Sequence, residues 1–228
     1  MSPTVLLVAK APVPGLAKTR LAAAVGAEAA ADVAAAALLD CLDAVRAAAG
    51  TLGHAAVVAL AGRLDEAARG GAIRAALREC VVLPQRGTGL GQRLAAAHAD
   101  TAAVRPGAGT LQVGMDTPQA GPDRLLDAVA CMEGADGVIG RAEDGGWWVL
   151  GLQRPASAAA LREVPMSCPD TADRTVAALA ARDVSLREGP LLRDLDTAAD
   201  AVAVADAAPG SRTAAAVRAA LAALAVGR

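Results

Sequence analysis

Aromatic residues are almost missing from this sequence of 228 residues, which contains no Phe, no Tyr and two Trp. Proteins that bind single-stranded nucleic acid stack bases on aromatic side chains, and this chain lacks such a surface. Its formal net charge of −2, from 22 basic and 24 acidic residues, also gives no attraction for nucleic acids or anionic membranes. We therefore expect neither a nucleic acid nor a membrane among the partners.

Long uninterrupted apolar runs are missing as well. The longest candidate, residues 29–49, is broken by four charged residues: Asp32, Asp40, Asp43 and Arg46. On a helical wheel the acids lie opposite Leu38, Leu42 and Val45, which predicts an amphipathic surface helix and not a membrane span. The N-terminal apolar stretch, residues 5–9, is too short for a signal-peptide core. We expect a cytoplasmic protein.

Cysteine and histidine are too sparse and too scattered to indicate a metal-thiolate or redox site. The four cysteines lie far apart, without the paired short spacings of zinc or redox motifs: Cys41, Cys80, Cys131 and Cys168. We interpret them as small apolar residues in a reducing compartment. His54 and His98 fit surface or core positions better than catalytic ones.

Short β-rich runs alternate with longer alanine- and leucine-rich helical stretches along the chain. The strand candidates are residues 4–9, 55–60, 80–83, 110–113, 137–140 and 147–152. This alternation predicts a single-domain α/β fold over residues 1–228, with a mainly parallel sheet and helices on both faces. Residues 198–228 read as a C-terminal helical tail. In such folds ligands bind at the carboxyl ends of the strands.

The loop after the first predicted strand carries the first functional signal. It reads Lys10-Ala-Pro-Val-Pro14-Gly15-Leu-Ala-Lys18-Thr19-Arg20-Leu. A strand, a Pro/Gly-rich loop and a helix start present backbone N–H groups where anions bind. The chain has only two lysines and both lie in this loop, which favours compact charges for phosphate oxygens over a plain solvated turn.

Two familiar nucleotide motifs are nevertheless not present. A P-loop needs glycines where Pro12 and Ala17 stand, so the loop is no Walker-type cradle. The glycines at 87, 89 and 91 follow a strand, but their spacing departs from G-x-G-x-x-G and they lie outside the first strand-helix turn. A Rossmann dehydrogenase is therefore disfavoured.

Carboxylates follow three later segments that we expect at the same edge of the sheet. Asp116 comes directly after the fourth predicted strand and could hold Mg²⁺, although it could equally cap the helix starting near Pro122. Glu143 and Asp144 precede two glycines and the Trp pair; adjacent strand residues face opposite sides, so at most one Trp should line a pocket. Asp194 and Asp196 alternate along an extended segment, so only one should point into the site, and Thr197 can cap the next helix.

Taken together, these motifs resemble the rSAM/selenodomain-associated transferase family 1, whose members share the glycosyltransferase-A fold of nucleotide-diphospho-sugar transferases. Five segments occur in the family's order over roughly residues 4–205: the Lys10 to Leu21 loop, Pro84-Gln85 with glycines, Gly-x-Asp116-x-Pro, Glu-Asp144-Gly-Gly and Asp194-x-Asp196-Thr. The first and last also resemble, more weakly, 2-phospho-lactate guanylyltransferases. The Trp pair departs from the family pattern and bears on the acceptor, not on the nucleotide.

The resemblance implies a role for each motif. The nucleotide would be held by Lys10, Pro14, Gly15, Lys18, Thr19, Arg20, Gln85, Gly87, Thr88 and Gly89, with the segment from Gln85 to Gly89 at the base. Asp116 would be the principal ligand of Mg²⁺ or Mn²⁺, and Asp194 or Asp196 the second. The acceptor side would be lined by Asp144, Gly145, Gly146 and Trp147. Lys18, Arg20, Asp116 and Asp144 would carry the catalysis.

Three functions are compatible with these residues. The loop cations favour a nucleotidyltransferase that moves a nucleoside monophosphate from a triphosphate to a small phosphorylated or carboxylated metabolite, because departing pyrophosphate carries high charge. A glycosyltransferase using a nucleotide sugar, with Asp144 or Glu143 activating the acceptor hydroxyl, is the alternative. A non-catalytic nucleotide-binding module is the third. The sequence leaves open whether the chain forms a homo-oligomer.

Overall fold

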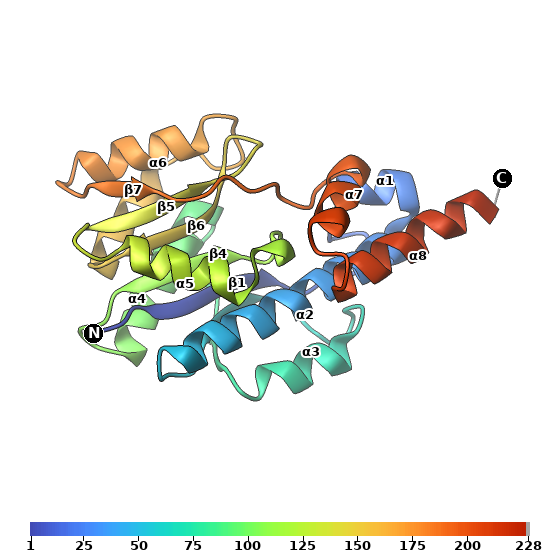
Figure 1. Cartoon of the computed structure of the whole chain (residues 1–228), viewed down its shortest axis with the longest axis horizontal. Coiled ribbons are helices and arrows are strands. Elements are labelled where there is room, and N and C mark those ends of the chain that lie inside the picture. The colour runs from blue at the N-terminus through green and yellow to red at the C-terminus, as the bar shows by residue number, and fades with distance from the viewer. Residues whose placement is uncertain (227–228) are drawn as a thin grey trace.

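The computed structural model describes residues 1–226, and these residues form a seven-stranded sheet with helices on both faces (Figure 1). The strands are β1 (Thr4–Lys10), β2 (Val57–Ala61), β3 (Val81–Pro84), β4 (Thr110–Gly114), β5 (Gly137–Arg141), β6 (Trp147–Leu152) and β7 (Leu186–Glu188). The α/β prediction is confirmed. All six predicted strands are present, with their ends displaced by at most two residues, and β7 is an additional strand.

The strand order is β3-β2-β1-β4-β6-β5-β7, and β6 alone among these strands runs against its neighbours. β1 lies between β2 and β4 in parallel register, with Val8 opposite Gly114 and Lys10 opposite Ala61. The carboxyl ends of β1, β2, β3 and β4 therefore meet at one edge of the sheet. The loops after β1 and β4, which carry the predicted phosphate and metal residues, leave from this edge.

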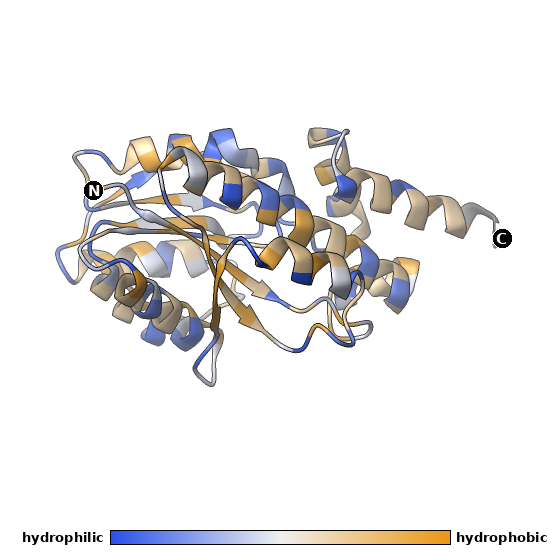
Figure 2. Ribbon diagram, turned by 90° about the horizontal axis from the view of Figure 1, so that it is seen from below, coloured by the Kyte–Doolittle hydropathy of each residue, from blue (hydrophilic) through white to orange (hydrophobic). Residues whose placement is uncertain are grey.

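Helices of two groups cover the two faces. The α-helices are α1 (Thr19–Val25), α2 (Ala27–Thr51), α3 (Gly70–Leu77), α4 (Leu90–Val104), α5 (Gly121–Cys131), α6 (Thr171–Ala180), α7 (Ala198–Ala207) and α8 (Arg212–Val226). Two 3-10 helices are η1 (Pro118–Ala120) and η2 (Pro155–Glu163). α2, α3 and α5 pack on one face, whereas α4, η2 and α6 pack on the other. Figure 2 shows apolar residues concentrated along the strands between these layers.

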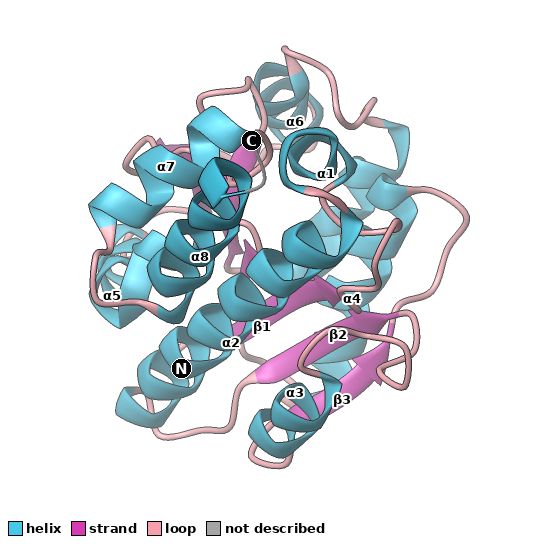
Figure 3. Cartoon of the chain, turned by 90° about the vertical axis from the view of Figure 1, so that its right-hand side faces the viewer, coloured by secondary structure: helices cyan, strands magenta, loops and turns pink. Residues whose placement is uncertain are grey.

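The long helix α2 is more deeply buried than the predicted surface helix. α8 lies along it on the side away from the sheet (Figure 3). The alanine-rich surface of α2 permits this close packing, with Val33 against Val204 and Val217 in one apolar cluster. Asp40 is not simply solvated, because its carboxylate accepts hydrogen bonds from the N–H and hydroxyl of Thr213 at the start of α8 (2.8 and 2.7 Å).

The C-terminal segment is helical, as α7 and α8, over the part that the structure describes; the last two residues of the predicted tail, 227 and 228, lie outside it. Thr197 caps α7, as predicted. Its hydroxyl accepts from the N–H of Asp200 and the Asp200 carboxylate accepts from the N–H of Thr197, a reciprocal capping box. Within residues 1–226, every helix is too short or too polar to cross a membrane.

Candidate active site

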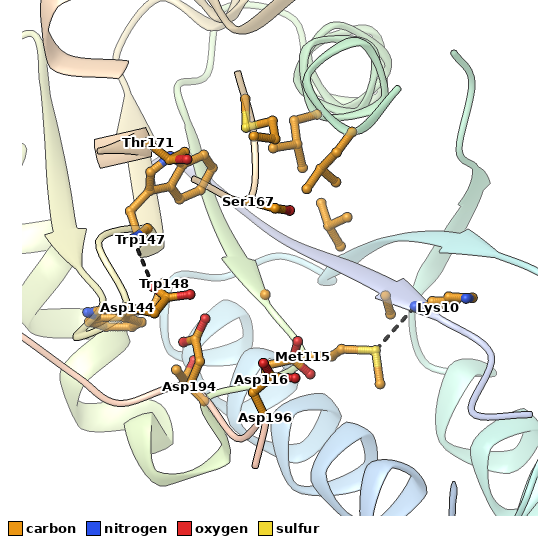
Figure 4. Close-up of a pocket in the computed structure, with 18 of the residues that line it drawn as sticks. Lys10, Met115, Asp116, Asp144, Trp147, Trp148, Ser167, Thr171, Asp194 and Asp196 are labelled. Carbon is orange, nitrogen blue, oxygen red and sulfur yellow. Dashed lines mark hydrogen bonds between the residues drawn. The ribbon is translucent and has the colours of Figure 1, made fainter. Parts of the chain in front are cut away.

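A cavity of about 670 Å³ opens at the carboxyl edge of β1 and β4, on the side of the sheet covered by α4. It has two chemically different parts. We call the first the charged end; it is formed by Lys10, Lys18, Arg20, Asp116, Asp194 and Asp196. We call the second the apolar pouch; it is formed by Val8, Leu90, Leu94, Trp147 and Met166. Figure 4 shows the three aspartates of the charged end close together, below the Trp147 and Ser167 side of the cavity.

Lys18 joins the loop after β1 to the loop after β4. It occupies the position before α1 in the left-handed conformation, with φ of 49°. Its Nζ lies 2.7 Å from Asp116 Oδ1 and donates to the carbonyl of Leu195. The Lys18 side chain is only 8% exposed, whereas the Asp116 side chain is 42% exposed, so the ion pair opens to the cavity on the carboxylate side. Asp116 is thus paired with a cation and does not cap the helix near Pro122, where no side-chain cap is found.

The other two cations of the loop lie nearer the rim. Arg20 Nη1 is 2.7 Å from Asp196 Oδ2, and the Arg20 side chain is 76% exposed. Lys10 Nζ donates to the carbonyl of Leu16 (2.9 Å). Thr19 also lines the cavity, but Pro14 and Gly15 do not. Gly15 instead makes the turn of the loop, with φ of 76°.

The segment from Arg193 to Thr197 crosses to the loop after β4. The Leu195 N–H donates to the Asp116 carbonyl (2.8 Å), and the Leu195 side chain is buried. The expectation that only one of Asp194 and Asp196 faces the site is wrong, since both line the cavity. The reason is local: the backbone bends at Leu195 instead of continuing as a strand, so the side chains do not alternate.

Asp194 has the most perturbed carboxyl group of the charged end. Burial raises its pKa to about 7, and the negative charges of Asp116 and Asp144 act in the same direction. Its Oδ1 atom is buried without a hydrogen-bond partner. Among residues 1–226, however, no three acidic, histidine or cysteine side chains are arranged to hold a metal ion as they stand. Two carboxylates that a metal would need as ligands are already paired with cations, Asp116 with Lys18 and Asp196 with Arg20.

The predicted acceptor side is only partly at the cavity. Asp144, Gly146 and Trp147 line it, whereas Gly145 lies behind it. A Cβ on Gly145, whose φ is 89°, would come within 1.8 Å of the Pro169 carbonyl oxygen, so this glycine lets the chain pass close to the 166–169 loop. Asp144 is exposed and accepts a hydrogen bond from the Gly146 N–H (2.8 Å).

Both tryptophans reach the cavity, which corrects the expectation that at most one would. Gly140 pairs with Val149 and Arg141 pairs with Trp147, which leaves Trp148 as an extra residue on β6. This bulge interrupts the alternation of faces. Trp148 is nevertheless 2% exposed and belongs mainly to the core, while Trp147 donates from Nε1 to the Thr175 hydroxyl (3.2 Å).

Only part of the segment predicted to hold the nucleotide base, residues 85–89, lines the cavity. Gln85 lines the cavity, and its Nε2 donates to the carbonyls of Ala9 and Ala59 (2.8 and 2.9 Å). Gly87, Thr88 and Gly89 do not line it. Thr88 instead donates from its N–H and hydroxyl to the Gln92 side chain, so this stretch builds the start of α4. Glu143 is also outside the cavity, paired with Arg193.

Sequence reasoning missed most of the apolar pouch and several polar residues that line the cavity beside it. The missed residues that line the cavity include Leu90, Arg93, Leu94, Gln112, Met115, Met166, Ser167, Cys168, Pro169 and Thr171. Gln112 could have been noticed, because it is the one polar side chain between Leu111 and Val113 in a buried strand. The 166–171 loop carries no comparable signal.

Comparison with protein families gives one match. The model of a family described as "Uncharacterized protein conserved in bacteria (DUF2064)" matches residues 42–168, more than half of the chain. Among curated protein sequences, none matches. The matched stretch contains Asp116 and Asp144 but neither the loop after β1 nor Asp194 and Asp196.

Solved structures share the fold over nearly the whole chain. A candidate nucleotide-diphospho-sugar transferase from Desulfovibrio desulfuricans G20 is 25% identical, with a TM-score of 0.79, over 97% of this chain and 96% of its own. Rv0371c of Mycobacterium tuberculosis H37Rv, in complex with manganese, is 18% identical, with a TM-score of 0.50, over 90% of this chain and 99% of its own. A CMP:2-keto-3-deoxy-manno-octonic acid synthetase complexed with CTP is 11% identical, with a TM-score of 0.50, over 90% and 97%.

These comparisons bear out the predicted similarity in fold to nucleotide-diphospho-sugar transferases. The narrower resemblances to the rSAM/selenodomain-associated transferases and to 2-phospho-lactate guanylyltransferases stay predictions.

Proposed function

Because the chain belongs to the bacterial DUF2064 family and has the fold of nucleotide-using transferases, we propose that it is a metal-dependent nucleotidyltransferase. In this proposal it transfers a nucleoside monophosphate from a nucleoside triphosphate to a small phosphorylated or carboxylated metabolite. The neighbours with bound manganese and bound CTP support a divalent metal and a nucleotide as its ligands.

One observation carries the proposal. Lys10, Lys18 and Arg20 meet Asp116, Asp194 and Asp196 in one cavity at the carboxyl edge of β1 and β4. These residues come from three segments that lie far apart in the sequence. Three cations suit the oxygens of a polyphosphate, and a group of carboxylates beside them suits the metal that accompanies it.

The carboxylates also fit a divalent cation by their charge. Burial and the neighbouring carboxylates Asp116 and Asp144 raise the pKa of Asp194, and a divalent cation beside these groups would stabilise their charged forms. Its unpartnered Oδ1 atom is a free oxygen ligand. Asp116 and Asp194, with Asp196, would hold Mg²⁺ or Mn²⁺, and the metal when bound would offset negative charge on the phosphates.

The chain's own residues then have separate tasks. The loop cations bind the β- and γ-phosphates and stabilise the charge that develops on pyrophosphate as the bond to the α-phosphorus breaks. Lys18 is paired with Asp116 in the structure, so a phosphate that binds Lys18 competes with this ion pair. Asp144, which is exposed and lies near Asp194 in the cavity lining, orients the acceptor whose oxygen attacks the α-phosphorus.

Glycosyl transfer is the second candidate, and one comparison favours it: the Desulfovibrio protein is described as a candidate nucleotide-diphospho-sugar transferase. In that case Asp144 would act as the base for an acceptor hydroxyl. Glu143 is not suited to this task, because it is paired with Arg193 outside the cavity.

A two-stage experiment tests the proposal. Thermal shift with nucleoside triphosphates and sugar nucleotides, with and without Mg²⁺ or Mn²⁺, selects the donor, and incubation with candidate acceptors identifies the products. We expect pyrophosphate from a triphosphate, with sugar nucleotides acting at most as inhibitors. Release of a nucleoside diphosphate from a sugar nucleotide would establish the second candidate instead. Binding without turnover for any acceptor would favour a non-catalytic module.

A further inference from the structure

The polar side chain of Gln112 lies inside an otherwise apolar part of the sheet. Its direct neighbours on the two adjacent strands are Leu6 on β1 and Leu150 on β6, and both are fully buried. Gln112 itself is 2% exposed, yet it lines the cavity. Burying an amide costs free energy unless its hydrogen bonds are satisfied, so the position calls for a polar partner.

Helix α4, which packs on the same face of the sheet, brings a polar side chain to this position. His98 is fully buried, and its Nδ1 lies 2.6 Å from the Thr110 hydroxyl, two residues before Gln112 on the same face of β4. The other ring nitrogen, Nε2, and the Gln112 Oε1 atom are both buried, and neither has a hydrogen-bond partner. Gln112 also raises the pKa of His98, against the larger effect of burial, which lowers it.

We call the row of polar side chains from Thr110 through His98 to Gln112 the relay. The protonation state of His98 determines in which direction its hydrogen bonds run. Burial lowers the pKa of His98 to about 4, so the ring is neutral at pH 7 and carries one N–H. If Nε2–H is directed at Gln112 Oε1, Nδ1 accepts from the Thr110 hydroxyl. The relay then runs from Thr110 through His98 to the Gln112 oxygen. Only the amide N–H₂ group of Gln112 is left for a ligand.

The surroundings of Gln112 indicate what that ligand group is. Val8 and Leu94 of the apolar pouch favour an uncharged group beside Gln112, although Arg93 also lines the cavity, and Gly114 leaves open space, since a Cβ there would meet no atom within 4 Å. The pouch continues directly into the charged end, because Lys10 lies two residues beyond Val8 on β1. A molecule with a charged tail and an uncharged ring, such as a nucleotide, matches this division of one cavity. This places the base beside Trp147, a residue that the resemblance assigns to the acceptor side.

We propose that Gln112 donates a hydrogen bond to a carbonyl oxygen of the nucleotide base, and that His98 is a positioning residue that fixes the Gln112 amide in this orientation. The inference deepens the proposed function and rests on it. It identifies the preferred donor as a nucleotide whose base has a ring carbonyl, as in cytosine, uracil and guanine, and it disfavours adenine, which has none.

Binding selectivity tests this assignment better than affinity alone. Dissociation constants of CTP, UTP, GTP and ATP, each with Mg²⁺, are measured by calorimetry on wild type and on Gln112→Met, together with inorganic pyrophosphate. We expect the wild type to bind one of the first three at least about tenfold more tightly than ATP, the usual effect of one buried hydrogen bond. In Gln112→Met this preference should nearly disappear, whereas ATP and pyrophosphate affinities stay unchanged.

Two His98 variants test the positioning role. His98→Leu cannot donate to Gln112 and should lose most of the preference, whereas His98→Gln retains an N–H donor and should keep it. Thr101→Val is the matched control, because Thr101 is also a fully buried residue of α4 with an unpartnered hydroxyl but does not line the cavity. Urea unfolding verifies that each variant is folded, and Thr110→Val gives a second way to weaken the relay.

The outcomes separate this inference from the proposed function. A wild type that binds nucleotides but prefers ATP, or has no preference, overturns the inference and leaves the proposed function standing. A Gln112→Met variant with the wild-type preference does the same. Full preference in His98→Leu overturns the positioning role. A wild type that binds none of the nucleotides overturns the proposed function, and the inference with it.

Discussion

At the charged end of the cavity Lys18 and Arg20 each have a carboxylate partner, whereas Gln112, beside the apolar pouch, and the buried His98 of α4 leave hydrogen-bonding atoms unsatisfied. The charged end holds several ionised side chains, and most of their charge is neutralised by ion pairs between them. The region of Gln112 has one amide and one imidazole in a nearly apolar setting.

The difference indicates how each end responds to a ligand. A phosphate arriving at the charged end meets Lys18 and Arg20 already paired with carboxylates, so its binding to them competes with existing ion pairs. A carbonyl group that enters beside the apolar pouch meets the Gln112 amide N–H₂ group, which donates to no other group among residues 1–226. We therefore expect the charged end to supply catalysis and much of the affinity, and the pouch to supply selectivity at small cost.

The largest effect should come from the carboxylate that pairs with Lys18. Asp116→Asn should lower turnover below detection and remove the metal-dependent part of nucleotide binding, because a neutral amide cannot supply the charge. Turnover and Mn²⁺-dependent nucleotide binding are measured together. Asp123→Asn, an exposed acid in the first turn of α5, is the control. Full metal-dependent activity in Asp116→Asn would remove Asp116 from the metal site.

The free energy of unfolding should depend on pH in opposite directions through Asp194 of the charged end and through His98 of α4. The folded pKa of Asp194 is raised to about 7, so its contribution to stability is lost as the pH rises from about 4 to 7. The folded pKa of His98 is lowered to about 4, so its contribution is lost as the pH falls from about 6.5 to 4. Each amounts to on the order of 3 to 4 kcal/mol at most, and in the wild type they oppose each other.

Urea unfolding in EDTA between pH 4 and 8 checks this. Relative to wild type, Asp194→Asn should gain stability as the pH rises, and His98→Gln should gain it as the pH falls. His54→Gln is the control, since His54 is only partly buried and lies far from the cavity lining. Parallel pH curves for all four proteins would contradict the comparison.

Removing Lys18 and Arg20, the two loop cations with carboxylate partners, should weaken nucleotide binding by on the order of 2 to 4 kcal/mol, the scale of two charge-assisted phosphate bonds. The variant is Lys18→Ala with Arg20→Ala, and calorimetry with a triphosphate measures the loss. Arg63→Ala with Arg162→Ala removes two exposed cations outside the cavity and should bind as wild type. An unchanged affinity in the folded Lys18/Arg20 variant would refute the phosphate assignment.

The smallest effect concerns the support of the charged end. Thr197→Ala removes the cap of α7, next to Asp196, and should lower the free energy of unfolding by about 1 kcal/mol. Thr51→Ala removes an exposed hydroxyl that donates only within α2 and should change it by less than about 0.5 kcal/mol. Equal effects in urea unfolding would show that the cap contributes nothing specific.

The sequence predicts the charged end well and the apolar pouch poorly. Lysine occurs only in the loop after β1, and this composition marks both Lys10 and Lys18, which line the cavity. Asp116 is predictable because it follows a buried strand. Their roles in binding nucleotide and metal stay predictions.

The failures have local physical reasons. β7 was not predicted because it has only three residues, Leu-Arg-Glu, without an apolar run. Periodicity cannot foresee the bend at Leu195 or the extra residue Trp148 on β6, and each changes which side chains face the cavity. The pouch is assembled by packing of α4 and the 166–171 loop on β1 and β4, which depends on contacts between distant segments.

The backbone hydrogen bond between Leu195 and Asp116 has a consequence for biosynthesis. The ribosome completes β1 and Lys18 early, β4 and Asp116 midway, and the segment from Arg193 to Thr197 only after about six-sevenths of the chain. Until that segment is synthesised, Lys18 and Asp116 lack Leu195, whose carbonyl accepts from Lys18 and whose N–H donates to the Asp116 carbonyl. A nascent chain released before that segment would therefore lack Asp194 and Asp196, two of the six side chains that form the charged end.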